Sequence, residues 1–290
     1  MPRILEFTVT DDYNGKKVIH FLRGAEKLSS SLVATLRHTP GGIMLNGEPS
    51  RTIDRIKTGD ILRVTVPEKH APAEPSSLVL QVVYEDEDII VVNKPGNLAM
   101  HPTHNHQGDT LSNALSGYLA AKGIFVPLRA VGRLDKGTSG LVVCALNSYC
   151  AARLTESVEK TYYAVATGSF TGEGTIDKPI FRPYPDKTVR AVSENGDRAV
   201  THWRAIKSSD GMTLLEIHLE TGRTHQIRVH FSFLGAPLAG DDMYGASREL
   251  IERPALHCGR VCFIHPVTKE KINLYAPLPE DMQKLVDTIE

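Results

Sequence analysis

The 290-residue sequence lacks a surplus of either charge, with 33 Lys and Arg against 34 Asp and Glu and a net charge of −1. This balance excludes a protein whose whole body is strongly basic and binds nucleic acid by charge alone, although it permits a local basic groove. Cysteines are few, with four at positions 144, 150, 258 and 262 and no CxxC pair. That spacing excludes a secreted disulfide framework and indicates reduced thiols in a cytosolic protein.

The sequence also lacks any apolar run near the roughly 18 residues that a membrane span requires. Its first dozen residues, MPRILEFTVTDD, carry charges where a signal peptide would be apolar. We therefore expect no membrane association and a cytoplasmic location. The 41% of apolar residues and 23% of charged residues are typical of a globular protein, so a sizeable core is expected.

A linker is predicted at residues 67–77, PEKHAPAEPSS, where three prolines and small residues interrupt the apolar patterning. We expect a small module at 1–66 and a larger domain at 78–290. The module is predicted as an α/β unit, with strands at 4–10, 43–45 and 60–66, helices at 18–24 and 29–38, and a turn at Asn46-Gly47.

The module contains the most basic stretch of the chain. From Lys16 to Arg63 there are nine Lys or Arg residues against four Asp or Glu residues. Such a run is most often a solvated helix face, and the alternative interpretation is a small RNA-binding surface.

Period-2 patterns typical of strands dominate the larger domain. The expected strands lie at 78–84, 88–93, 141–145, 162–167, 201–207 and 214–219. The expected helices lie at 110–122, 148–158 and 225–234. Because strands follow one another in runs and helices are few, we expect an α+β fold on a largely antiparallel or mixed sheet.

Four segments of this domain are unusually polar or rich in glycine for the elements that they interrupt. They are NKPG (93–96) with His101 beyond it, GRLDKGTSG (132–140), KTYYA (160–164) and TGRTHQIRVH (221–230). Alternation in the second places Arg133 and Asp135 on one side of an extended chain, and its glycines let a ligand approach the backbone. Taken singly, these residues have ordinary explanations, such as a local ion pair, solvated helix-start arginines at 223 and 228, or a strand aromatic at Tyr162.

Together and in this order, the segments resemble a pseudouridine synthase of the RluA family. The matching strings are VVNKPGNLAMHP (91–102), GRLDKGTSGLVV (132–143), KTYYAVATG (160–168), GRTHQIRVHFSFLGAPLAGDDMYG (222–245), LHCGRVCFIHP (256–266) and APLP (276–279). One departure is Gly132, where most members of the family have His or Asn. A Gly-Arg-Leu-Asp opening is more typical of the sister family that modifies small-subunit RNA, so Gly132 bears on the choice of substrate.

Residues 20–64 resemble the α-L RNA-binding module of a small-subunit ribosomal protein. The helix pair, LNG at 45–47 and KTGD at 57–60 match that module in order. Where the module has Arg at the start of its second helix, this chain has Ser30. One phosphate contact is therefore missing, and weaker RNA affinity is expected there.

The resemblance implies an isomerase that converts uridine to pseudouridine in structured RNA, with large-subunit ribosomal RNA as the expected substrate and transfer RNA as the alternative. It assigns the nucleophile to Asp135, its cationic partner to Arg228 and the active-site aromatic to Tyr162. The RNA contacts that it implies are Arg133, in the gap left by the flipped nucleotide, and Arg223, His225 and Gln226. No redox or phosphoryl step occurs, so we expect no cofactor or metal, and a monomer with no obligatory protein partner.

Two alternatives of other classes stay open. A zinc site would draw on the histidines at 101, 104 and 106, or on His257, Cys258, Cys262 and His265. The histidines lie in a loop without a patterned carboxylate, and both cysteines are expected on one side of a strand as small buried apolar residues. The other alternative is a non-catalytic RNA-binding scaffold, against which the presence of Asp135, Tyr162 and Arg228 argues.

Overall fold

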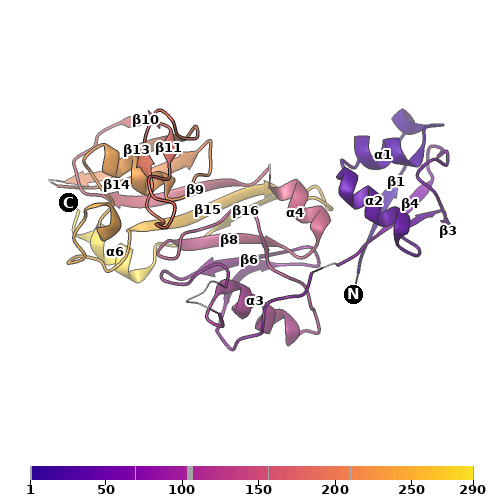
Figure 1. Cartoon of the computed structure of the whole chain (residues 1–290), viewed down its shortest axis with the longest axis horizontal. Helices are drawn as coiled ribbons and strands as arrows, with labels where there is room; N and C mark the ends of the chain where they lie inside the picture. Colours follow the sequence, from indigo (N-terminus) through magenta and orange to yellow (C-terminus); the bar gives the residue numbers. More distant parts are fainter. Residues whose placement is uncertain (1, 69, 103–106, 156, 210, 290) are drawn as a thin grey trace.

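The computed structural model describes residues 2–68, 70–102, 107–155, 157–209 and 211–289. Within these ranges the chain forms a four-stranded sheet, a ten-stranded sheet and a two-stranded ribbon (Figure 1). The small sheet belongs to an N-terminal module, residues 2–66, and the large sheet to the rest of the chain. No helix in the described ranges is long and apolar enough to cross a membrane.

The N-terminal module is an antiparallel sheet, ordered β1-β4-β2-β3, with two short helices. Its elements are β1 (Arg3–Thr8), α1 (Val18–Gly24), α2 (Ser30–His38), β2 (Ile43–Leu45), β3 (Glu48–Pro49) and β4 (Ile61–Val66). Ser29 caps α2, because its hydroxyl accepts a hydrogen bond from the main-chain N–H of Leu32 at 3.1 Å. Asn46 and Gly47 have φ angles of +51° and +89°, as a type I′ turn between β2 and β3 requires.

The larger domain is built on one mixed sheet, ordered β10-β13-β14-β9-β15-β8-β6-β5, with β16 paired to β15 and β7 to β8. Its strands are β5 (Gln81–Glu85), β6 (Ile89–Lys94), β7 (Arg129–Ala130), β8 (Ser139–Ala145), β9 (Glu159–Ala166), β10 (Glu173–Asp177), β13 (Val200–Ser209), β14 (Met212–Leu219), β15 (Leu256–Ile264) and β16 (Lys271–Tyr275). Only β15 and β8 pair in parallel among these neighbours in the described chain. The predicted α+β class on a largely antiparallel, mixed sheet is confirmed.

Four α-helices and a short ribbon complete the part of this domain that the structure describes. They are α3 (Leu111–Ala120), α4 (Ser148–Leu154), α5 (Gln226–Phe233), α6 (Glu280–Asp287) and the ribbon of β11 (Ile180–Phe181) and β12 (Ala191–Val192). Thr110 caps α3 in a reciprocal capping box with Asn113, so the predicted start of this helix is confirmed.

Three predicted boundaries are wrong by three or four residues. Strand β9 starts at Glu159 rather than at 162, because pairing with β15 extends that far. Helix α4 ends at Leu154 rather than at 158, because the chain enters β9 at Glu159 and there pairs with β15. Strand β5 starts at Gln81 rather than at 78, since its partner β6 reaches only Lys94 before Pro95. A proline cannot donate to a strand ladder, so the pairing stops there.

The sequence predicted that Cys258 and Cys262 lie on one side of a strand, and this prediction is wrong. The register shifts between Cys258 and Arg260, so that Cys258 pairs with Tyr162 and Cys262 with Glu159. Tyr162 and Glu159 are three positions apart on β9 and therefore face opposite sides of the sheet. A bulge thus separates the two thiols, which cannot contribute to one site.

The N-terminal module lies beside α4 in Figure 1, and side-chain contacts join it to Asp88, the residue before β6, and to Tyr149 of α4. Arg3 donates from Nε and Nη2 to the two carboxylate oxygens of Asp88, each at 2.8 Å. The rings of Phe7 and Tyr149 lie 6.0 Å apart between the same two parts of the chain. Asp88 and Tyr149 are both buried, so the module covers this end of the larger domain.

Candidate active site

Three of the four polar segments meet at one cavity of about 540 Å³. It is lined by residues 131–135 of the loop before β8, by the first half of β9, and by residues 218–228 leading into α5. Strands β8 and β9 flank β15 in the sheet, so pairing with β15 brings the segments 132–140 and 160–164 together. The remaining segment, at 93–96, does not line the cavity, but its Lys94 contacts the loop that carries Asp135.

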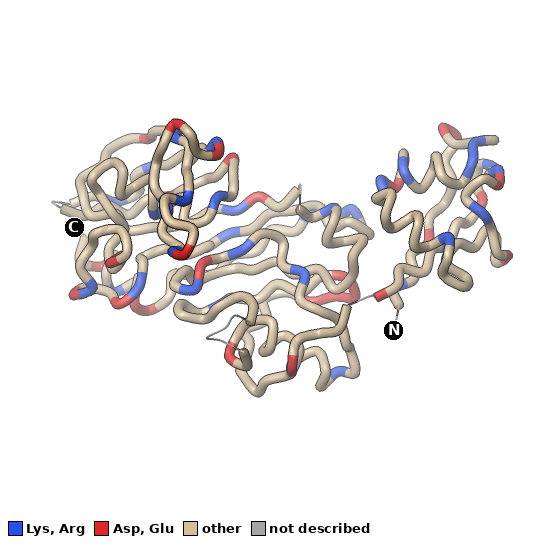
Figure 2. The backbone as a smooth tube through the Cα atoms, in the orientation of Figure 1, with Lys and Arg blue, Asp and Glu red and all other residues tan. Residues whose placement is uncertain are grey.

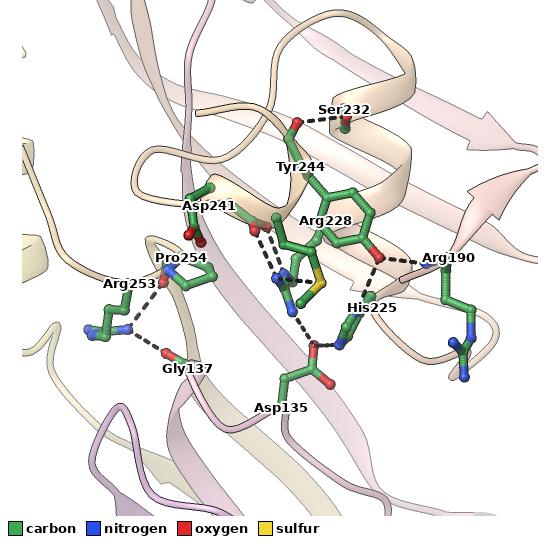
Figure 3. Close-up of polar contacts among 12 residues, drawn as sticks. Asp135, Gly137, Arg190, His225, Arg228, Ser232, Asp241, Tyr244, Arg253 and Pro254 are labelled. Carbon is green, nitrogen blue, oxygen red and sulfur yellow. Dashed lines mark hydrogen bonds and ion pairs between the residues drawn. The ribbon is translucent and has the colours of Figure 1, made fainter. Parts of the chain in front are cut away.

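Asp135 and Arg228 face each other in this cavity (Figure 3). The distance from Asp135 Oδ2 to Arg228 Nη1 is 3.4 Å. Asp241, which is fully buried, accepts hydrogen bonds from Arg228 Nε at 2.6 Å and Nη2 at 2.7 Å. Burial works to lower the pKa of Arg228, but hydrogen bonds and charge from Asp241, together with Asp135, raise it overall. Arg228 is therefore a fixed cation with one nitrogen left for Asp135.

The turn before α5 is held from inside by Gln226. Its Oε1 accepts from the main-chain N–H of Arg223 at 3.0 Å, and its Nε2 donates to the carbonyl of Val200 at 2.9 Å. The residue is 3% exposed. Its amide is thus used in tying the turn to β13, and an RNA contact through that amide would require these bonds to break.

His225, the residue before α5, has a left-handed backbone with φ of +58°. Its Nε2 lies 3.8 Å from Asp135 Oδ2, and its Nδ1 lies 2.9 Å from the hydroxyl of Tyr244. That hydroxyl also accepts the main-chain N–H of Arg190 at 2.9 Å. Burial lowers the pKa of His225, against the opposing effect of the Asp135 carboxylate. The imidazole is therefore neutral near physiological pH.

Tyr162 lines the cavity from β9 and is 7% exposed. Burial raises the pKa of its phenol well above the ordinary value, with smaller contributions from Cys258 and Asp135. Its hydroxyl makes no hydrogen bond to another residue of the described ranges. Tyr162 thus presents a neutral aromatic ring and an available O–H group at the wall of the site.

A fully buried lysine supports the loop that carries Asp135. Lys94 Nζ donates to the carbonyl of Lys136 at 3.2 Å and to the carbonyls of Pro95 and Leu98 at 2.9 Å each. Burial lowers the pKa of Lys94 to about 7. Its amino group therefore ties the NKPG turn to the residue next to the proposed nucleophile.

Arg253 holds the same loop one residue further on. Its Nη1 donates to the carbonyl of Gly137 at 3.1 Å, and its Nε and Nη2 donate to Asp281 at 2.7 and 2.8 Å. A Cβ at Gly96 would lie 2.5 Å from Cδ of Arg253, so the absence of a side chain there lets the arginine pass. The loop around Asp135 is thus fixed by two buried basic side chains, Lys94 and Arg253.

Gly132 has a left-handed backbone, with φ of +75°. This region is open to glycine and, among other residues, is enriched in Asn, Asp and His. Gly, Asn and His are therefore all compatible with the left-handed backbone that this position has here. A Cβ at Gly132 would lie 2.7 Å from Lys160 Nζ, which donates to the carbonyl of Val131 at 2.7 Å.

Two of the expected RNA-binding arginines lie at the exposed rim of the cavity. Arg133 makes no hydrogen bond or ion pair with another residue that the structure describes. Arg223 donates from Nε to the carbonyl of Arg198 at 3.0 Å, and its Nη1 lies 3.5 Å from Asp197. Both guanidinium groups are accessible to a bound strand.

The histidines considered for zinc have other partners where the structure describes them. His101 Nδ1 lies 3.1 Å from the hydroxyl of Ser112, and His257 Nδ1 lies 2.9 Å from that of Ser139. His104 and His106 lie outside the described residues. Within those ranges, no three His, Cys, Asp or Glu side chains are grouped so that they could hold a metal ion.

Sequence reasoning did not single out Asp241, Tyr244, Arg253 or Arg190. Asp241 and Tyr244 stand in a glycine-flanked string that also fits an ordinary turn. Asp241 is distinguished by its burial, at 0% exposed, and Tyr244 by its hydrogen bond to His225, and one sequence displays neither. Arg190 contributes only its main-chain N–H, which leaves no trace in the residue type.

The known proteins that this chain is similar to in sequence and structure are named as pseudouridine or pseudouridylate synthases. The family model described as RNA pseudouridylate synthase matches residues 88–233. The uncharacterized RNA pseudouridine synthase YjbO of Bacillus subtilis is 38% identical over 270 residues, covering 89% of this chain and 94% of its own. Ribosomal large subunit pseudouridine synthase D of Escherichia coli is 39% identical over 241 residues, covering 77% of this chain and 74% of its own. The structure of human RNA Pseudouridylate Synthase Domain Containing 1 aligns with a TM-score of 0.57 and 26% identity, over 74% of this chain and 96% of its own.

Proposed function

Since this chain belongs to the RluA family of RNA pseudouridine synthases, we propose that it isomerises uridines of large-subunit ribosomal RNA, with Asp135 as the nucleophile. The observation that carries the assignment of Asp135 is its place in the cavity. One carboxylate oxygen faces Arg228, which the buried Asp241 holds in position. The reaction class, an isomerisation, follows from the family.

The reaction needs a nucleophile and an exchange of one proton. It breaks the bond between N1 of uracil and C1′ of the ribose, turns the base and joins its C5 to C1′. The proton that leaves C5 is balanced by one that N1 gains, so the composition is unchanged. A carboxylate is a suitable nucleophile at the sugar or at the ring, and Asp135 supplies it in this proposal.

The cavity fits a flipped nucleotide beside Tyr162. Its volume of about 540 Å³ lies within the range of roughly 300–1,000 Å³ that is typical of small-ligand sites. The neutral phenol of Tyr162 offers a ring on which the uracil can stack, close to where the C5 proton leaves. Arg133, exposed at the rim, would fill the gap that the flipped uridine leaves in the RNA stack.

Two features support ribosomal RNA as the substrate. Several relatives are named ribosomal large subunit pseudouridine synthase D, among them proteins of Xanthomonas campestris and Vibrio cholerae, each 38% identical to this chain. The N-terminal module also carries Lys and Arg on several of its elements (Figure 2), although it has Ser30 where the module that it resembles has Arg. We propose that the module binds structured RNA and that the enzyme acts in the cytoplasm, where ribosomal RNA is found.

Mapping pseudouridines in total RNA from cells with and without this gene tests the substrate. We expect the deletion to remove pseudouridine from one or a few positions of large-subunit ribosomal RNA and from no other RNA. Loss confined to transfer RNA would overturn the ribosomal assignment and leave the enzyme class intact. An unchanged map would contradict the proposed substrate altogether.

A further inference from the structure

Tyr244 and His225 form a chain of polar contacts that ends at Asp135, and the reaction as described above gives this chain no role. We propose that the two residues position the nucleophile, by directing the Nε2–H of His225 at Oδ2 of Asp135 so that Oδ1 is left for the substrate. The proposal rests on the assignment of Asp135 as the nucleophile. It also extends the sequence interpretation of His225, which was expected only to contact RNA.

The main-chain N–H of Arg190 fixes which group donates in each of the two hydrogen bonds of the Tyr244 hydroxyl. The main-chain N–H of Arg190 can only donate, so the Tyr244 oxygen accepts it at 2.9 Å. The hydroxyl proton is then donated to His225 Nδ1, at 2.9 Å. The reverse arrangement would leave the tyrosine proton without an acceptor among the described residues. A neutral imidazole whose Nδ1 accepts carries its proton on Nε2.

Arg228 and His225 both point to the same carboxylate oxygen of Asp135. Arg228 Nη1 lies 3.4 Å and His225 Nε2 lies 3.8 Å from Oδ2 of Asp135, and Figure 3 shows the second oxygen pointing away from both side chains. Oδ1 has no hydrogen-bond partner within the described ranges. A movement of roughly 1 Å would bring Nε2 into hydrogen-bond distance, and such contacts often tighten only when substrate binds.

The backbone of His225 supports a functional role for its placement. It is left-handed at φ of +58°, which costs free energy for a residue with a Cβ and persists where the surrounding structure enforces it. The hydroxyl of Ser232 donates to the main-chain carbonyl of Tyr244 at 3.0 Å and so fastens the tyrosine to α5. The helix that carries Arg228 thus also fixes the residue that orients His225.

Removing only the hydroxyl of Tyr244 tests the hydrogen bond from Tyr244 to His225 without changing the packing of the tyrosine ring. The Tyr244 ring lies 5.0 Å from the guanidinium carbon of Arg228 and meets the His225 ring edge-on at 5.7 Å. Tyr244→Phe keeps both contacts and removes two hydrogen bonds, the one accepted from the main-chain N–H of Arg190 and the one donated to His225 Nδ1. Tyr275→Phe, which deletes the same atom from a tyrosine that is 61% exposed on β16, is the matched control.

The measurement is tritium release from C5 under single-turnover conditions, with the full-length enzyme in excess. The RNA probe is total RNA from a strain that lacks the gene and has grown on [5-³H]uracil. For Tyr244→Phe we expect the maximal rate to fall by about tenfold, while the enzyme concentration at half-saturation stays within about twofold. The control should match the wild type in both quantities.

A second pair of variants tests the donor itself. His225→Gln retains an N–H near the position of Nε2, whereas His225→Met has a similar length and no donor. Neither glutamine nor methionine is enriched in the left-handed region as histidine is, so the difference between the two variants reports the donor. We expect Gln to keep the maximal rate within about threefold of wild type and Met to lose at least about tenfold.

Three results would overturn the proposal. They are an unchanged maximal rate in Tyr244→Phe, equal rates in His225→Gln and His225→Met, or a loss that appears only in the half-saturating concentration. Failure of the proposed function is separately visible. Wild-type tritium release by Asp135→Asn would refute the nucleophile, and the use of total RNA keeps the assay independent of which RNA is the substrate.

Discussion

The buried carboxylate of Asp241 holds Arg228 by two hydrogen bonds, at 2.6 and 2.7 Å, and so aims the third nitrogen of the guanidinium at the active-site cavity. This relationship explains how a cation can lie beside Asp135 in a largely buried place. The fixed fork of the guanidinium satisfies one carboxylate with two nitrogens and offers the third to another. Asp241 therefore matters to the site although it does not line the cavity.

Asp241→Asn should destabilise the protein and slow the reaction. The substitution leaves Arg228 as a buried cation without its full partner, which should lower the free energy of unfolding by about 3 kcal/mol. Urea denaturation measures this change, with Asp242→Asn as the control. Asp242 pairs with Arg248 at the surface, where both side chains are more than half exposed, so we expect a change within about 0.5 kcal/mol. Equal effects of the two variants would show that Asp241 is not the structural partner that we describe.

Lys94 should make the stability depend on pH. The pKa of Lys94 is about 7 in the folded protein, against an ordinary value of 10.5, so between these values the unfolded chain binds the proton more tightly. The free energy of unfolding of the wild type, relative to Lys94→Met, should therefore rise as the pH increases from 7 to 9. Urea denaturation at three pH values measures the difference. If the free energy of unfolding of the wild type minus that of Lys94→Met stays constant or falls over this range, the burial of a titrating lysine here is contradicted.

Gly132 should tolerate Asn better than Ala. At φ of +75°, alanine pays about 1 kcal/mol or more for a left-handed backbone, whereas asparagine visits this region more readily. Thermal denaturation should rank the wild type above Gly132→Asn and that variant above Gly132→Ala. Gly108→Ala serves as the control, because a Cβ there meets no atom within 4 Å and the backbone is not left-handed. An alanine variant as stable as the wild type would refute the backbone explanation of this position.

Arg3 should anchor the N-terminal module to the larger domain. Arg3→Met removes two hydrogen bonds at 2.8 Å from Asp88, which is 3% exposed. We expect faster hydrogen exchange in α4, measured by mass spectrometry, and a loss of about 2 kcal/mol in the free energy of unfolding. Arg63→Met is the matched control, since Arg63 pairs with Glu6 at 2.7 Å inside the module with both side chains about half exposed. If exchange in α4 is unchanged by Arg3→Met, this pair does not hold the interface.

The parts of the fold that the sequence predicted well are those with local signals. Local hydrogen bonds or backbone angles mark three element boundaries, at Thr110, Ser29 and the Asn46-Gly47 turn. The structure has a helix start at each of the first two and a turn at the third. Boundaries set by distant partners were missed. The end of α4 and the start of β5 depend on where β15 and β6 allow pairing, which the local pattern does not contain.

The candidate site divides in the same way. Asp135, Tyr162 and Arg228 stand in distinctive strings, and the structure brings all three to one cavity. Asp241 and Tyr244 became visible only through burial and contact, because a carboxylate or a tyrosine near glycines fits many turns. Gln226 is turned inward by hydrogen bonds to the main chain of Arg223 and Val200, although the sequence predicted that it contacts RNA.

The most direct test of the account is complementation of the gene deletion by Asp135→Asn, read out as a full pseudouridine map. The substitution keeps the size of the side chain and removes the charged nucleophile. We predict that wild-type protein restores every pseudouridine lost in the deletion strain, and that Asp135→Asn, expressed at the same level and folded, restores none. Restoration of those pseudouridines by Asp135→Asn would contradict the central claim that this carboxylate performs the isomerisation.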